Sequence, residues 1–156
     1  MIELMVTTVL IGIITAMAGP QFQKVYERIK LRSQMRDITS TLRLARSTAI
    51  ATKVQHGVYF DPTARTVTFF KDKADLNSFN YTTADSVIKV DTLPVQFVWM
   101  GTDCSNNTIC FRANGSAGYT GNGNVWTLGY TPKVVGTSTT NVLASTGRVA
   151  VQVWIY

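Results

Sequence analysis

The sequence predicts an α+β fold in which one long N-terminal α-helix packs on an antiparallel β-sheet domain. Residues 1–52 are first apolar and then amphipathic with helical spacing. The remainder changes to short β-branched or alternating runs separated by turn residues. A chain of 156 residues, 46% of them hydrophobic, can bury one core of ordinary size. A helix followed by consecutive strands is typical of an α+β domain.

The first predicted element is an apolar helix over residues 1–20, MIELMVTTVLIGIITAMAGP. Nineteen helical residues rise about 28 Å, close to the roughly 30 Å hydrocarbon thickness of a bilayer. No Lys or Arg precedes the run and no small-residue cleavage site follows it, so the segment does not fit a secretory signal peptide. We therefore expect residues 1–20 to stay in the mature protein as a membrane anchor.

The second element continues the helix from Gln21 to about Thr52, as the amphipathic half of a globular domain over residues 21–156. Its apolar residues recur at alternating spacings of four and three, which predicts one stripe along a helix that covers a sheet. The stripe consists of Leu31, Met35, Ile38, Leu42, Ala45 and Ala49. The arginines of this half lie mainly off the stripe; they are Arg32, Arg36, Arg43 and Arg46.

Strands are predicted for the runs that follow the helix. They are HGVYFD, TVTFF, SVIKV, VQFVWM, TICFRA, NVWTLGY and RVAVQVWIY. The segments NGSAGYTGNGN and VGTSTTNVLASTG are rich in Gly, Asn, Ser and Thr, and we expect both to be loops.

The formal net charge of +6 comes from the segment between Pro20 and Lys53, which has eight basic and two acidic residues. From Gln55 onward, seven basic and six acidic residues nearly cancel. The positive-inside rule alone would keep the basic segment in the cytoplasm, whereas two downstream cysteines favour export. A short positively charged leader, removed before this chain begins, would resolve the conflict.

Cys104 and Cys110 lie close together in DCSNNTIC, and the Asn106-Asn107 pair predicts a turn between them. The simplest prediction is a local disulfide in an exported protein, with two free thiols as the alternative. So small a loop would contribute roughly 2 kcal/mol to stability on the chain-entropy model.

Glu3 is the carboxylate at the head of the apolar run. Leaving a charge unpaired in hydrocarbon costs on the order of 3 kcal/mol or more, so an ionisable group there usually has a partner. We expect Glu3 to have one. An ordinary membrane anchor with one interfacial carboxylate is the alternative.

The N-terminal stretch IELMVTTVLIGIITAMAGPQF resembles that of type IV pilins and type II secretion pseudopilins. Glu3 matches the glutamate of that family and Pro20 its helix-kinking proline, while Met1 stands where the family has a leucine. The blocks LRLARSTAIATK, ICFRANGSAG and STGRVAVQVW resemble, in order, the GspH/FimT group of pseudopilins and minor pilins. The resemblance implies the type IV pilin fold, a long N-terminal α-helix packed on an antiparallel β-sheet domain.

The resemblance also implies a structural subunit of a type IV pilus-like or type II secretion pseudopilus filament. Its partners would be copies of itself, other pilins or pseudopilins, a prepilin peptidase and an inner-membrane assembly platform. The chain would lie in the inner membrane before assembly and in an extracellular or periplasm-spanning filament afterwards.

Assembly roles follow for four residues of the apolar segment. In the family the glutamate is thought to meet the N-terminal amine of a neighbouring subunit, so Glu3 would fix axial register more than it adds net stability. Gly12, Gly19 and Pro20 would allow the helix to kink or partly unwind when packed. A residue that fixes the axial register is needed where subunits stack repeatedly, so Glu3 favours a subunit of the fibre body. The GspH/FimT resemblance itself points instead to a subunit at the fibre tip.

No catalytic residue, metal ligand or cofactor emerges from the sequence, and an enzyme is not predicted. His56 is the only histidine, which leaves no histidine partners for a metal site or a Ser-His-Asp arrangement. The competing function is a minor pilin at the fibre tip that binds DNA or a surface ligand through Arg148 and neighbouring loops. Some DNA-uptake relatives carry a second arginine where this chain has Ala150, which disfavours DNA.

Overall fold

The computed structural model describes residues 1–73 and 78–156, apart from the side chains of Met17 and Pro20 and the surroundings of Gly19. One long helix, α1 (Ile2–Thr52), precedes the strands, as predicted. The strands are β1 (His56–Asp61), β2 (Thr66–Lys71), β3 (Ser86–Thr92), β4 (Phe97–Thr102), β5 (Thr108–Phe111), β6 (Ala117–Gly118), β7 (Asn124–Thr131), β8 (Val134–Val142) and β9 (Val149–Ile155).

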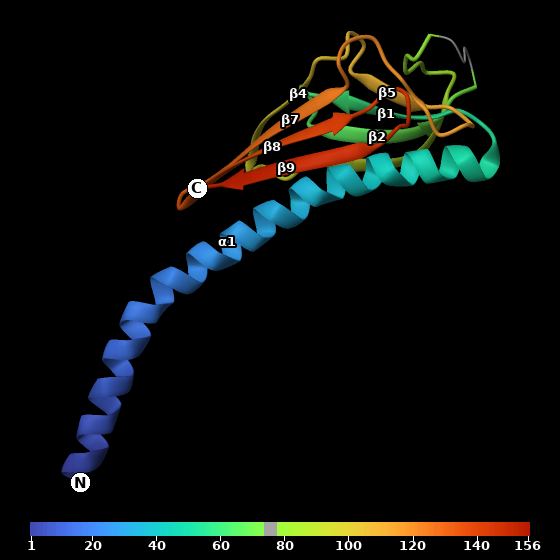
Figure 1. Cartoon of the computed structure of the whole chain (residues 1–156). Helices are drawn as coiled ribbons and strands as arrows, with labels where there is room; N and C mark the ends of the chain where they lie inside the picture. The colour runs from blue at the N-terminus through green and yellow to red at the C-terminus, as the bar shows by residue number, and fades with distance from the viewer. Residues whose placement is uncertain (74–77) are drawn as a thin grey trace.

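The strands form two antiparallel sheets (Figure 1). One has the order β3-β2-β1-β5-β6 and the other β4-β7-β8-β9. Both sheets contribute to one hydrophobic core, with Phe60 and Phe111 from the first and Met100 and Val125 from the second. Tyr119 joins them again, because its hydroxyl donates to the Val142 carbonyl at the end of β8, at 2.6 Å.

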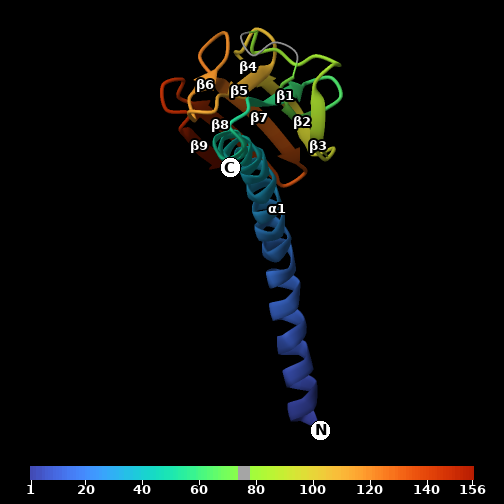
Figure 2. The same cartoon turned by 90° about the vertical axis from the view of Figure 1, so that its right-hand side faces the viewer.

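Helix α1 consists of two halves with different surroundings. The N-terminal half projects from the domain, and the other half lies along the sheets beside β9 (Figures 1 and 2). The whole predicted stripe on the second half, from Leu31 to Ala49, is buried, which confirms the pattern-based prediction. The helix ends where Lys53 takes a left-handed backbone conformation, with φ of 58°.

Two strands were missed by sequence reasoning, since β6 lies in NGSAGYTGNGN and β8 in VGTSTTNVLASTG. The loop prediction for the second segment is wrong, because β8 pairs with β7 from Val134 to Asn141 and with β9 from Gly136 to Val142. Small and hydroxyl-bearing residues alternate between the core and the outside there, with Ser138 and Thr140 buried. Threonine favours extended backbone, so the segment forms a strand despite its polar composition.

Candidate functional site

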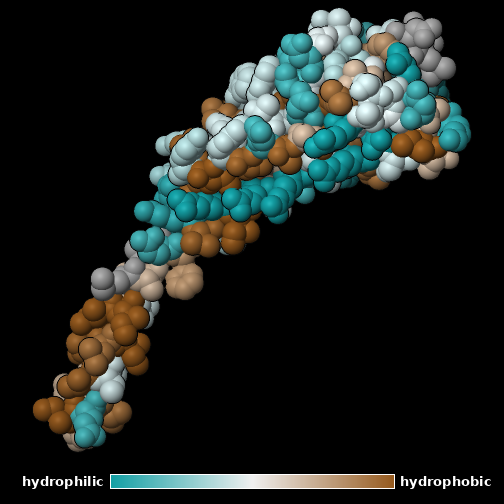
Figure 3. All heavy atoms as spheres, in the orientation of Figure 1, coloured by the Kyte–Doolittle hydropathy of each residue, from teal (hydrophilic) through white to brown (hydrophobic). Residues whose placement is uncertain are grey.

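The projecting half of α1 carries an apolar surface that the domain does not cover. Its large hydrophobic side chains are all more than half exposed; they are Ile2, Leu4, Met5, Val6, Val9, Leu10, Ile11, Ile13 and Ile14. Figure 3 shows them as a hydrophobic sleeve below a largely hydrophilic domain. In the described part of the chain, α1 contains a stretch long and apolar enough to cross a membrane. An exposed apolar surface of this extent indicates contact with lipid or protein.

Glu3 lies in the first turn of α1, where a negative charge interacts favourably with the helix dipole. Among the described residues it forms no ion pair. Gly12 lies on an open face, since a Cβ added there would meet nothing within 4 Å. The helix runs through this segment without interruption and curves along its length (Figure 1). The surroundings of Gly19 and Pro20 lie outside what the structure describes, and unwinding of the helix in a packed filament stays a prediction.

The three sequence blocks that resemble the GspH/FimT group converge at the far end of α1. The Arg46 Nε donates to the Gly115 carbonyl at 3.1 Å, which ties the helix to the loop before β6. The loop before β9 approaches the same point, because a Cβ on Gly147 would lie 2.1 Å from the Gly115 oxygen. Arg46 therefore holds together segments that are far apart in the sequence.

Arg148 lines a hollow of about 360 Å³ beside the hydrogen bond between Arg46 and Gly115. Arg43 and Arg46 of α1 line the same hollow, together with Ser47, and no acidic side chain is among its lining residues. Arg43 is held by the Val149 carbonyl, to which its Nη2 donates at 3.5 Å. Three guanidinium groups around one hollow can bind an oxyanion through charge-assisted hydrogen bonds.

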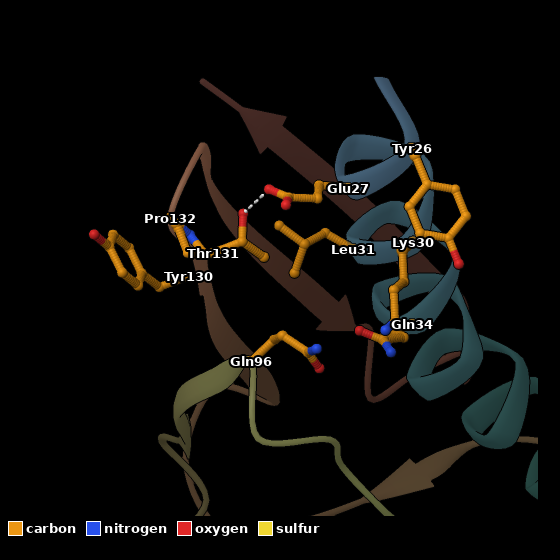
Figure 4. A pocket seen from close by; sticks show the side chains of 9 residues that line it. All are labelled: Tyr26, Glu27, Lys30, Leu31, Gln34, Gln96, Tyr130, Thr131 and Pro132. Carbon is orange, nitrogen blue, oxygen red and sulfur yellow. Dashed lines mark hydrogen bonds between the residues drawn. The ribbon is translucent and has the colours of Figure 1, made fainter. Parts of the chain in front are cut away.

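A second hollow, of about 220 Å³, lies where α1 leaves the domain (Figure 4). One wall is a face of α1 and the other comes from the segments around β4 and β7. Its lining residues are Tyr26, Glu27, Lys30, Leu31, Gln34, Gln96, Tyr130, Thr131 and Pro132. The Thr131 hydroxyl donates to Glu27 at 2.6 Å, which closes one end. The side-chain oxygens of Gln34 and Gln96 are buried and accept no hydrogen bond within the described structure.

The two cysteines do not form the predicted disulfide; both are buried free thiols. Cys110 lies within β5, whose side chains alternate between the two faces of the sheet. Its sulfur lies near Gly57 and Phe70, whereas Cys104 belongs to the core cluster together with Ile109 and Phe111. The turn at Asn106-Asn107 is present, with Asn107 at φ of 50°, but the strand alternation directs the two thiols into different surroundings.

His56 begins β1, as expected for a strand residue, and its Nδ1 lies 2.8 Å from the Val54 carbonyl oxygen. In the described ranges, no group of His, Cys, Asp and Glu side chains is placed to hold a metal ion. Burial raises the pKa of the thiol of Cys110 to about 12 and also raises that of Cys104, so neither is an activated nucleophile.

Sequence reasoning missed Glu27, Gln34 and Gln96 because nothing in the local pattern connects α1 with the segment before β4. It noted Arg43 and Arg46 only as charges off the apolar stripe. The sequence signal that could have connected Arg43 and Arg46 with Arg148 is that they lie in the first and the last of the three blocks that resemble the GspH/FimT group.

A projecting apolar half-helix joined to a domain of antiparallel strands defines the type IV pilin fold. The structure resembles the crystal structure of the type IV minor pilin FimU from Pseudomonas aeruginosa, with a TM-score of 0.55. The match covers 81% of this chain and 90% of FimU, at 13% sequence identity. No protein-family model and no curated protein sequence matches the chain. The likeness establishes the fold.

Proposed function

We propose that this chain is a structural subunit of a type IV pilus-like or type II secretion pseudopilus filament. The exposed apolar half of α1 carries the proposal. Burying surface of this kind stabilises by roughly 25 cal/mol per Å², whether the neighbours are lipid tails or other helices. Residues 1–20 would anchor the subunit in the inner membrane and then form the filament core with other copies or other pilins.

Glu3 is the proposed register device of that core. A carboxylate in a water-poor helix bundle requires an opposite charge, and the N-terminal amine of a neighbouring subunit would supply it. Gly12, Gly19 and Pro20 are proposed to let the packed helices approach and bend. A prepilin peptidase and an inner-membrane assembly platform are the implied partners, and the assembled filament would be extracellular or span the periplasm.

The test replaces Glu3 with Ala or Gln, which both remove the charge, and with Asp as the matched control that keeps it. Membrane fractionation should show all variants inserted at the wild-type level. The Ala and Gln variants should lose filament incorporation, and the Asp variant should retain part of it. Normal filament yield from the Ala variant would overturn the register role.

The finer assignment is to the GspH/FimT group, supported by the convergence of its three blocks around Arg46. We place the subunit in the body of the fibre, because a register device suits repeated stacking. The fold likeness to a minor pilin favours the alternative place at a tip. Quantitative mass spectrometry of sheared fibres decides between them, since a body subunit should dominate their protein content.

The hollow between Arg43, Arg46 and Arg148 supports a second function, the binding of a phosphate-bearing polymer or a surface ligand. Binding of duplex DNA should then fall with salt at a slope near −0.9 per phosphate neutralised. Arg148→Ala should reduce the slope, whereas Lys73→Ala, an exposed cation outside the hollow, should not. Weak binding with a shallow slope, unchanged by Arg148→Ala, would leave filament formation as the sole proposed function.

A further inference from the structure

The packed half of α1 has two sides of different charge. One faces β9 and the other faces β3 and the segment before β4 (Figure 2). On the β9 side, Arg28 and Arg32 line a hollow with Ile155, and Arg43 and Arg46 line the hollow with Arg148. Arg36 continues the row of Arg28 and Arg32, since residues four apart share a helix face.

We name these six arginines the arginine side. No acidic residue lines either of its two hollows, and within the described ranges none of the six forms an ion pair. Arg28, Arg32, Arg36 and Arg148 are exposed. Figure 3 shows a hydrophilic band along the packed half of α1. Six arginines without an ion pair on one side of the domain favour a partner that brings carboxylates.

Carboxylates lie on the opposite side, which we name the carboxylate side. Glu27 lines the hollow of Figure 4, and Asp37 lines a second one with Asp91. Lys30 and Lys89 also lie here, but Lys89 is paired with Asp91 at 2.7 Å. Asp37 forms no ion pair within the described ranges.

We propose that the arginine side of one subunit contacts the carboxylate side of the next copy of this chain. Two arginine sides cannot face each other, because like charges placed together cost several kcal/mol. The contact is therefore head-to-tail, and a contact of this type builds an open filament and not a closed dimer. The inference rests on the proposed filament function. It specifies the two faces of the domain that contact each other between neighbouring subunits of the filament.

An arginine suits the carboxylate side in its hydrogen-bonding chemistry as well as its charge. A guanidinium has five donors, and this side offers the exposed carboxylate of Asp37 as an acceptor. A heterologous contact of this kind satisfies groups on both faces that the isolated chain leaves without partners.

Charge reversal in the full-length chain tests the proposal. Asp37→Arg, and separately Arg32→Asp together with Arg36→Asp, should each reduce filament yield by about tenfold through like-charge contacts. The two changes combined should restore most of the yield, because each variant face then meets its opposite charge. Lys73→Asp, a charge reversal at an exposed residue that lines none of these hollows, is the control and should form filaments normally.

Crosslinking provides a readout that does not depend on yield. Copies with Asp37→Cys mixed with copies with Arg36→Cys should crosslink to each other in filaments more than either does to itself, and the native cysteines are buried. Equal self-crosslinking, or charge variants that assemble normally, would overturn the contact and leave the filament function standing. A wild-type chain that forms no filaments would overturn both.

Discussion

The Arg46 guanidinium and the Gly115 carbonyl are joined by a hydrogen bond of 3.1 Å across 69 positions of the sequence. This bond connects the far end of α1 with the first sheet, and the backbone of Gly147 packs against the same carbonyl. The helix is thereby fixed at the end opposite to its projecting half.

Replacing Arg46 should therefore destabilise the domain. Hydrogen bonds to charged groups contribute about 1.5–3 kcal/mol, and part of that should be lost in Arg46→Met. Arg46→Lys should recover little, because an ammonium lacks the guanidinium fork. Urea unfolding in detergent measures the change. Arg32→Met, which removes an exposed arginine, should alter the free energy of unfolding by less than about 0.5 kcal/mol.

Two glycine-to-alanine changes should act in opposite directions. Gly147 has φ of 63°, and its Cβ would meet the Gly115 oxygen at 2.1 Å, so Gly147→Ala should cost about 1–3 kcal/mol. Gly12→Ala adds a methyl group to an open helix face and should stabilise the isolated subunit by about 0.5–1 kcal/mol. Thermal unfolding compares the two. A reduced filament yield from Gly12→Ala would show that helices approach closely at this position.

The buried hydroxyl pair between β7 and β8 should show non-additive energetics. Thr127 and Ser138 lie opposite each other with their oxygens 2.7 Å apart. Thr127→Val alone leaves the Ser138 hydroxyl without that partner, at a cost of about 1–3 kcal/mol. The double variant with Ser138→Ala should cost less than the sum of the single changes. An additive double-mutant cycle would mean that the pair contributes no coupling.

Both cysteines should be labelled by a thiol reagent after denaturation without reduction, and slowly in the native protein. Mass spectrometry would then find two labels on the unreduced, denatured chain. A chain that takes up labels only after reduction would restore the disulfide that the sequence predicts.

The raised pKa of Cys110 also predicts a loss of stability at alkaline pH. The folded thiol keeps its proton to about pH 12, whereas an unfolded thiol loses it near pH 9.0. Between these values the unfolded state binds fewer protons, so the free energy of unfolding falls as the pH rises. Cys110→Ala should show a shallower decline over that interval. If the free energy of unfolding falls equally steeply with pH in the wild-type chain and in Cys110→Ala, the raised pKa does not belong to Cys110.

The order of elements could be predicted because each rests on a local pattern. The stripe from Leu31 to Ala49 has a helical period, and runs such as HGVYFD match the strand β1 residue by residue. β8 escaped prediction because Gly136, Ser138 and Thr140 fill the middle of its buried face, and large apolar residues lie only at its two ends, at Val134 and Val142. Hydrophobic periodicity does not detect a strand whose buried face is made mostly of small and hydroxyl-bearing residues.

Site residues could be predicted from the sequence only where their chemistry differs from that of their sequence neighbours. Glu3 is conspicuous as a charge among aliphatic side chains, whereas Gln34 and Gln96 look like ordinary surface amides until the fold brings them to one hollow. The failed disulfide has the same origin, since spacing brought Cys104 and Cys110 close in sequence and strand alternation separated their thiols. Contacts between distant segments depend on the fold.

The packing of α1 beside β9 has a mechanical consequence. A pull on the projecting half travels along one continuous helix to a stripe that lies along the sheets (Figure 1). The load is then applied in shear, so the contacts of the stripe bear it together and are not peeled apart one by one. Arg46 lies toward the far end of this interface and remains engaged until the helix as a whole slides.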